Sequence, residues 1–339
     1  YGLGGPLSKP FGVGIVGCGL IGWKRANALG AGGRLVACMD LDSSKAEKLA
    51  LDHGCEFLSN WKELISRKDV ELVIVSTLHD SLAEITQAAI IAGKHVLVEK
   101  PAARKAEELE PLLELKRQHE VKVRVGFNHR YHRSLRKAKE LFDSKVLGEM
   151  MFIRGRYGHG GRVGYDREWR SKPDLSGGGE LIDQGPHMID LSRMFLGDFV
   201  EYQGYAHTYF WDMPVDDNGF MLLKTAKHQT AFLHVSCTEW KNLFSMEIYG
   251  KKGKLELFGL GGSYGTEKII WYKMLPEMGP PETICWEFPM GDDSWEFEMN
   301  EFYKDILLDR EPEAGLADAV AALKIIEKIY MDSGYDHCS

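Results

Sequence analysis

The chain has 339 residues, which is enough for two domains of roughly 150 residues each. Hydrophobic residues make up 44% of the chain and charged residues 27%, a balance typical of globular proteins. The formal net charge of -8 excludes a general nucleic-acid or anionic-membrane binder, since such a protein needs a basic surface.

The six cysteines show no CxxC spacing, which speaks against a disulfide framework or a cysteine zinc site. No apolar run approaches the roughly 18 residues of a membrane span, and the first ten residues lack the pattern of a signal peptide. We therefore expect a cytoplasmic protein with reduced thiols and with neither a membrane nor a nucleic-acid partner.

Strand and helix patterns alternate through the first third of the chain. Runs rich in valine, isoleucine and leucine lie at 12–17, 34–40, 71–77, 95–100 and 121–127, and helical patterns separate them. Near-continuous apolar strands between helices predict a parallel, doubly wound sheet of the Rossmann type. Ligands of such a sheet bind beyond the carboxyl ends of its strands.

The rhythm changes after Phe127. A helical pattern at 134–143 and a strand at 149–157 are followed by strand patterns at 199–210, 217–224, 229–238, 243–250 and 253–258. Successive strands without helices predict a large open and mostly antiparallel sheet. Two helical patterns, 294–309 and 316–330, end the chain. We expect a nucleotide-binding domain over 1–126 and a substrate-binding and oligomerisation α/β domain over 127–339.

The stretch GCGLIG at 17–22 predicts a dinucleotide site. Gly17, Gly19 and Gly22 follow a strand and open a helix, where glycines allow a tight turn and close approach of a pyrophosphate to the helix end. Asp40 follows Gly22 by eighteen residues at the end of the second strand and is placed to accept from a ribose hydroxyl. Because no arginine follows Asp40 closely, NAD is predicted in preference to NADP.

Two further segments carry candidate chemistry. The lysine of VEKP, Lys100, ends a parallel strand, where an ammonium group can stabilise a developing alkoxide; the alternative is a surface lysine. In SGGGELIDQGPHMIDL, 176–191, a helix would place Asp183 and His187 one turn apart on one face. Pro186 either kinks this helix or begins it, and a beginning there would favour neutral His187 near the positive helix end.

Other readings of the 176–191 segment remain open. Its aspartates and histidine could bind a metal, but no thiolate or second histidine cluster accompanies them, so no metal is expected. It could also be an ordinary core or capping segment. The triple glycine is expected to let the backbone approach cofactor or substrate closely.

Together, GCGLIG, EKP at 99–101, GFNHRY at 126–131 and GGGELIDQGPHMIDL resemble the glucose-fructose oxidoreductase, inositol dehydrogenase and MocA (Gfo/Idh/MocA) family. The resemblance covers most of the chain in order. It implies a Rossmann domain followed by an open-sheet domain often used for oligomerisation, here a homodimer or homotetramer. It places the family's catalytic lysine on Lys100, with a Lys100–Pro101 bond that is often cis, and the aspartate–histidine pair on Asp183 and His187.

The predicted cofactor contacts combine the nucleotide motif with the resemblance. They are Gly17, Gly19, Leu20, Ile21, Gly22, Asp40, Thr77, Leu78, His79, Glu99, Lys100 and Asn128. One departure concerns the nicotinamide side, because the chain has TLHDSL at 77–82 where the family commonly has TPN followed by a histidine.

The segment 154–170 holds five arginines interleaved with aromatic residues, a composition that suits an anionic or nucleotide-linked sugar as well as a solvated loop. The expected substrate contacts are Arg130, Tyr157, Arg162, Trp169, Arg170, Asp183 and His187.

These patterns predict an NAD-dependent oxidoreductase acting on a secondary alcohol of a sugar or cyclitol. His187 would take the hydroxyl proton, Lys100 would stabilise the oxygen, and Asp183 would orient His187 or bind a neighbouring hydroxyl. A redox-neutral glycosidase or isomerase that uses NAD transiently is one alternative. A non-catalytic NAD sensor is the other, although a sensor has no need of the three catalytic residues.

Overall fold

The computed structural model describes residues 9–335. The chain folds into two compact units. One unit comprises residues 9–126 together with Trp295–Ala319, and the other comprises Phe127–Ser294 together with residues 320–335. Residues 295–319, predicted to belong to the second domain, pack with the first unit in the structure.

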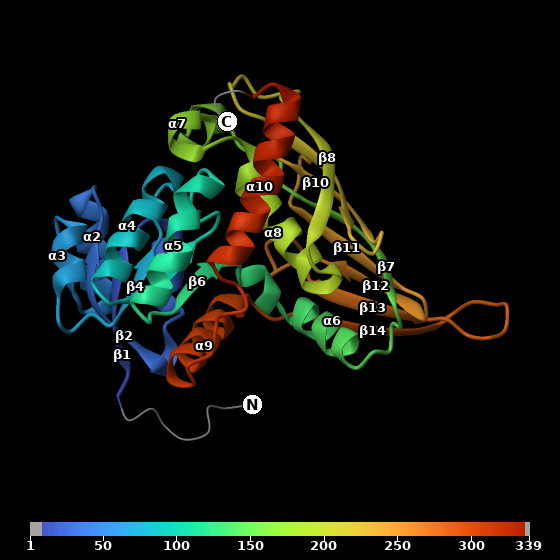
Figure 1. The fold of residues 1–339 in the computed structure, drawn as a ribbon, viewed down its shortest axis with the longest axis horizontal. Coiled ribbons are helices and arrows are strands. Elements are labelled where there is room, and N and C mark those ends of the chain that lie inside the picture. The colour runs from blue at the N-terminus through green and yellow to red at the C-terminus, as the bar shows by residue number, and fades with distance from the viewer. Residues whose placement is uncertain (1–8, 336–339) are drawn as a thin grey trace. The chain divides into compact units, whose positions relative to one another are not determined.

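The first unit is built on a six-stranded sheet in which every neighbouring pair is parallel, with strand order β3-β2-β1-β4-β5-β6. The strands are β1 (Phe11–Val16), β2 (Gly33–Met39), β3 (Glu56–Leu58), β4 (Leu72–Val75), β5 (His95–Glu99) and β6 (Val123–Gly126). The connecting helices are α1 (Leu20–Asn27), η1 (Gly30–Gly32), α2 (Ser43–His53), α3 (Trp61–Ser66), α4 (His79–Ile91) and α5 (Ala106–Gln118). This is the predicted doubly wound Rossmann architecture (Figure 1).

Helix α9 (Ser294–Leu307) completes the core of the first unit. Met299, Phe302 and Tyr303 are fully buried in a cluster with residues of β1, β2, β4, β5, α1 and α2. The Tyr303 hydroxyl donates to the carbonyl of Leu29 at 3.0 Å. The apolar face of α9 therefore explains why a segment so late in the chain belongs to this unit.

The second unit is built on an eight-stranded sheet with the order β14-β13-β12-β11-β7-β10-β9-β8. Its strands are β7 (Met150–Gly158), β8 (Phe199–His207), β9 (Asn218–Thr225), β10 (Thr230–Ser236), β11 (Leu243–Gly250), β12 (Gly253–Phe258), β13 (Glu267–Lys273) and β14 (Glu282–Phe288). All neighbours are antiparallel except β7 and β10, which confirms the predicted mostly antiparallel sheet.

Helices cover one face of this sheet. The helical segments are η2 (Asn128–Tyr131), α6 (Arg133–Asp143), η3 (Tyr165–Arg167), η4 (Trp169–Ser171), α7 (Pro173–Ser176), α8 (Glu180–Leu196) and the larger part of α10 (Leu316–Ser333). Helix α8 packs on β7, β9 and β10, and α6 packs on β12, β13 and β14 (Figure 1). Met188 of α8 lies close to Gly155 of β7, because a Cβ added at Gly155 would be 2.4 Å from the methyl group of Met188.

Candidate active site

The glycine-rich turn between β1 and α1 has the shape of a phosphate cradle. Gly17 has φ +99°, and a Cβ there would lie 2.5 Å from the backbone of Ser76, so only glycine fits. A Cβ on Gly22 would lie 2.1 Å from the carbonyl oxygen of Gly17, which explains the tight packing of α1 on the turn. At Gly19, in contrast, a Cβ would meet nothing within 4 Å. The open space lies at the N-terminus of α1, where backbone amides favour phosphate.

Asp40 lies next to this turn, beyond the end of β2. One of its carboxylate oxygens accepts from the amide of Cys18 at 2.7 Å, and the other accepts from the amide of Asp42 at 2.9 Å. The side chain is therefore held in place by the turn itself. That Asp40 accepts from the ribose hydroxyls stays a prediction.

Lys100 follows β5 and is half-buried, and its bond to Pro101 is cis, as the resemblance implied. The preceding residue, Glu99, faces into the first unit. Its carboxylate pairs with Arg25 of α1 at 2.5 Å, and Glu298 of α9 pairs with the same guanidinium at 2.6 Å. Glu99, predicted to contact the cofactor, thus ties the strand that carries Lys100 to α1.

The remaining predicted cofactor residues differ in their surroundings. Leu20 is exposed at the beginning of α1, and Ile21 is half-buried. The Thr77 hydroxyl accepts from Ser81 at 2.8 Å, whereas Leu78 is exposed and His79 is buried at the beginning of α4. Asn128 belongs to the second unit, where its amide donates to Ser294 at 3.0 Å.

Asp183 and His187 lie on α8, where both are buried. The helix begins at Glu180, with Gly179 as its N-cap, and Pro186 lies inside it. The predicted alternative of a helix beginning at Pro186 is therefore wrong. His187 lies in the second turn, so the positive end of the helix acts on Glu180 and Asp183 instead.

His187 lies among aromatic rings. The ring of His129 is stacked on it, with centroids 3.6 Å apart and planes at 16°. Phe127 and Tyr157 meet it edge-on, each at 6.2 Å. Burial raises the pKa of Tyr157 well above its usual value, so this hydroxyl stays protonated. Sequence reasoning missed His129, although its place in GFNHRY directly after the last Rossmann strand was a signal.

Charged side chains surround Asp183. Arg170 donates to its carboxylate at 3.2 Å, and the charge of Asp183 raises the pKa of Arg170. One turn earlier, the buried carboxylate of Glu180 lies 3.5 Å from His159. Burial acts to lower the pKa of His159, but the hydrogen bond and charge of Glu180 outweigh burial and raise it. The N-terminal end of α8 therefore combines two carboxylates with two basic groups.

The other predicted substrate arginines have carboxylate partners within the second unit. Arg130 forms a bidentate pair with buried Asp190 of α8, at 2.7 and 2.5 Å. Arg162 pairs with Glu168 at 2.7 Å. Trp169 is half-buried and lies under the guanidinium of Arg170, 4.7 Å from ring centroid to Cζ.

Arg154 and Arg156 of the arginine-rich segment lie on the opposite face of β7 from Tyr157. Arg154 pairs with Glu247 at 2.9 Å, and Arg156 is exposed. These two arginines therefore face away from α8, because side chains alternate along a strand.

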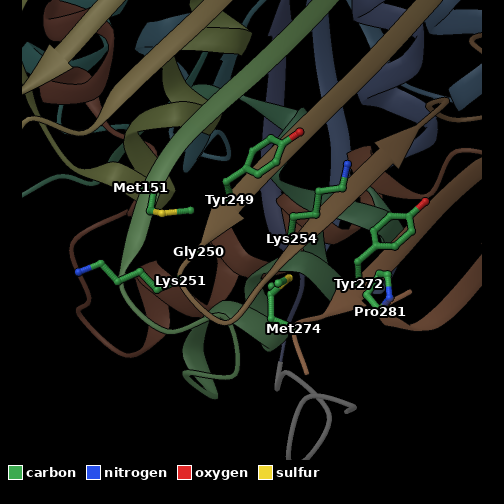
Figure 2. Close-up of a pocket in the computed structure, with 9 residues that line it drawn as sticks. Met151, Tyr249, Gly250, Lys251, Lys254, Tyr272, Met274 and Pro281 are labelled. Carbon is green, nitrogen blue, oxygen red and sulfur yellow. The ribbon is translucent and has the colours of Figure 1, made fainter. Parts of the chain in front are cut away.

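In the described part of the chain no helix covers this face of the second sheet, which we call the helix-free face (Figure 1). It contains a hollow of about 380 Å³ (Figure 2). Its lining is mostly apolar and comes from β7, β11, β12, β13 and the chain beyond β13: Met151, Tyr249, Gly250, Lys251, Gly253, Lys254, Tyr272, Met274 and Pro281. Neither Asp183 nor His187 lines it.

Within residues 9–335, no group of three or more histidine, cysteine or acidic side chains could hold a metal ion, and no helix could span a membrane.

The first unit thus has the fold and the turn of a dinucleotide-binding domain, and the second carries a buried aspartate and a buried histidine on one helix. These features define the chain as a two-domain oxidoreductase of the Rossmann class. Comparisons with known proteins agree. Residues 11–127 match the oxidoreductase family with an NAD-binding Rossmann fold, and residues 135–256 match the GFO/IDH/MocA C-terminal domain. The chain therefore belongs to the Gfo/Idh/MocA family, and its first unit is an NAD-binding domain.

Several relatives have named activities. Levoglucosan dehydrogenase of Pseudarthrobacter phenanthrenivorans is 29% identical over 171 residues, covering 50% of this chain but only 44% of that protein. Inositol 2-dehydrogenase of Gluconacetobacter diazotrophicus is 28% identical over 57% of this chain and 56% of that one. A dTDP-3,4-didehydro-2,6-dideoxy-alpha-D-glucose 3-reductase of Saccharopolyspora spinosa is 26% identical over 74% of this chain and 75% of that one.

Solved structures share the fold. Levoglucosan dehydrogenase in complex with NADH and levoglucosan aligns with a TM-score of 0.86 at 20% identity, over 96% of this chain and 98% of that one. An oxidoreductase domain protein from Kribbella flavida has the same TM-score at 24% identity and the same coverage.

Proposed function

We propose that the chain is an NAD-dependent dehydrogenase that oxidises a secondary alcohol of an uncharged sugar or cyclitol. The observation that carries the proposal is the buried pair of Asp183 and His187 on one face of α8, in a chain whose other unit is an NAD-binding domain. When bound, NAD supplies the hydride acceptor. The protein must then remove the hydroxyl proton and stabilise the oxygen.

We assign proton removal to His187. The stacked ring of His129, with its centroid 3.6 Å away, supports this role because it holds the His187 ring in one orientation. Lys100 is proposed to stabilise the substrate oxygen. Asp183, held by Arg170, is proposed to accept a hydrogen bond from a neighbouring substrate hydroxyl.

The preference for an uncharged substrate rests on the arginines. Arg130, Arg162 and Arg170 already have carboxylate partners, so an incoming phosphate would have to compete with these ion pairs. Carboxylates and a buried tyrosine, in contrast, suit several hydroxyl groups. The levoglucosan and inositol dehydrogenases among the relatives support this preference, while the dTDP-sugar reductase keeps a nucleotide-linked sugar as the alternative outcome.

We further propose that the protein forms a homo-oligomer through the helix-free face of the second sheet. The apolar hollow in Figure 2 supports this, because tyrosine and methionine side chains gathered in a depression are typical of protein interfaces. Replacing Met151 with a charged residue should lower the mass measured by light scattering. An unchanged mass would exclude this face as the interface.

The test of function is incubation with NAD and, separately, myo-inositol, levoglucosan and dTDP-glucose, following NADH by absorbance. Turnover of myo-inositol or levoglucosan supports the proposal, and turnover of dTDP-glucose alone would replace the uncharged substrate by a nucleotide-linked one. Product formation without net NADH would indicate the redox-neutral alternative.

A further inference from the structure

The first turn of α8 is held by side chains from two other parts of the second unit. Asp216, in the connection between β8 and β9, accepts from the amides of Gly179 at 2.9 Å and Leu181 at 2.7 Å through its carboxylate. Its backbone carbonyl accepts from the amide of Glu180 at 3.0 Å. The amide of Ile182 donates to the hydroxyl of Tyr330, on α10, at 3.2 Å.

Tyr330 and Asp216 form one connected cap. The Tyr330 hydroxyl donates to the Asp216 carboxylate at 2.6 Å and also accepts from the amide of Gly179 at 3.1 Å. Four consecutive amides at the beginning of α8 thus have acceptors from these two residues. A helix normally leaves such amides to a single local capping side chain or to water. Here no side chain of the N-cap residue is available, because that residue is Gly179.

The triple glycine of the sequence makes room for this cap. A Cβ on Gly178 would lie 2.4 Å from the Tyr330 hydroxyl and 2.6 Å from its ring carbon Cζ. A Cβ on Gly179 would lie 1.9 Å from the carbonyl oxygen of Asp216. The close approach expected from these glycines is therefore to Asp216 and Tyr330, and the space a side chain would need is filled by protein atoms.

The cap lies next to the residues of the proposed chemistry. Asp216 and Tyr330 are almost completely buried, and the first bond of the helix ladder runs from the Asp183 amide to the Gly179 carbonyl at 3.1 Å. The cap holds the residue at one end of that bond, and Asp183 is the other. His187 follows one turn later on the same face.

We propose that Asp216 and Tyr330 are positioning residues, which fix the axial position and rotation of α8 and thereby place Asp183 and His187 for proton transfer. This inference rests on the function proposed above. Small displacements matter because a catalytic group about 1 Å out of place can cost about a hundredfold in rate. The expected signature is a loss in kcat that exceeds any change in KM.

The test compares Tyr330→Phe and Asp216→Asn with the parent and with Tyr303→Phe. The last is a matched control, because it removes one hydroxyl from a fully buried tyrosine that bonds a carbonyl in the first unit. Burial raises the pKa of Asp216 to about 7, against the lowering effect of its hydrogen bonds. Kinetics are therefore measured at a pH about one unit above this pKa, where most Asp216 side chains are carboxylates.

For Tyr330→Phe we expect kcat to fall about tenfold to a hundredfold, with KM for the substrate turned over by the parent within about threefold. Hydrogen exchange of the amides of 179–182 should rise, and NAD affinity should not change. The double variant should lose no more than the more affected single variant, since both residues act in one network. If Asp216→Asn does not fold, Tyr330→Phe, which removes a single oxygen atom, carries the test.

Exchange that rises while kcat stays within about twofold of the parent would overturn the positioning role, and so would an equal loss in Tyr303→Phe. A parent protein that makes no NADH with myo-inositol, levoglucosan or dTDP-glucose contradicts the proposed function instead. Failure of the positioning role is therefore seen in the variants, whereas failure of the proposed function is seen in the parent protein.

Discussion

Replacing Asp40 with alanine should weaken NAD binding and shift the nucleotide preference toward NADP. A hydrogen bond to a charged group contributes about 1.5–3 kcal/mol. Since about 1.4 kcal/mol corresponds to a factor of ten, losing the bond to the ribose should weaken NAD roughly tenfold to a hundredfold. NADP should bind no more weakly than before, because the carboxylate that repels its 2'-phosphate has gone.

The structure suggests how to separate this effect from damage to the fold. Asp40 also accepts from the amide of Cys18, so Asp40→Ala should lower the free energy of unfolding by about 1–3 kcal/mol. Asp42→Ala is the matched control, because Asp42 is an exposed N-cap two residues away whose loss costs about 1 kcal/mol in the helix but removes the same charge.

Dissociation constants for both nucleotides, measured by calorimetry on folded protein, decide the matter. The reasoning is refuted if Asp40→Ala binds NAD as tightly as the parent, if Asp42→Ala weakens NAD equally, or if the parent itself prefers NADP.

Two further predictions concern stability and the phosphate cradle. Burial acts to raise the pKa of Glu267, but the hydrogen bond with His132 at 2.6 Å and two backbone amides lower it to about 2. Because the folded pKa lies below the unfolded one, this group contributes about 3 kcal/mol above about pH 5, which is lost as the pH falls toward 2. In Glu267→Gln the free energy of unfolding, measured with urea, should fall less as the pH is lowered from about 5 toward 2. An equal fall in parent and variant would contradict the pairing of Glu267 with His132. Gly19→Ala should fold normally but bind NAD weakly, whereas Gly22→Ala should lose stability; thermal unfolding with equal losses for both would refute this difference.

The sequence predicted the first unit well because its signals are local. Three glycines at fixed spacing and Asp40 at the end of the next strand lie within one βαβ unit, where the backbone alone brings them together. The same holds for Asp183 and His187, whose shared face follows from helical periodicity.

The beginning of α8 could not be predicted in this way. Its cap comes from Asp216 and Tyr330, and these side chains bond Gly179 across 37 and 151 residues of sequence. No capping residue is therefore visible beside the helix. Pro186 was the strongest local signal for a helix start, but the long-range cap decides where the helix begins.

The arginines and the late helix show the same limit. The pairing of Arg130 with Asp190 spans 60 residues, so the sequence could not show that this arginine has a carboxylate partner. Strands β13 and β14 were not recognised. Residues 295–319 belong to the first unit because Met299, Phe302 and Tyr303 are buried in its core. An amphipathic pattern predicts a helix with one buried face but not which unit buries it.

The proposed mechanism is tested most simply by measuring NADH formation by the parent, His187→Gln and Lys100→Met with myo-inositol and with levoglucosan. We expect the parent to reduce NAD with at least one of these substrates. We also expect each variant to lose about a hundredfold to ten-thousandfold in kcat. His187→Gln should bind NAD normally, as measured by calorimetry. Variants with the kcat of the parent, or a parent that binds NAD but forms no NADH with either substrate, would contradict the proposed mechanism.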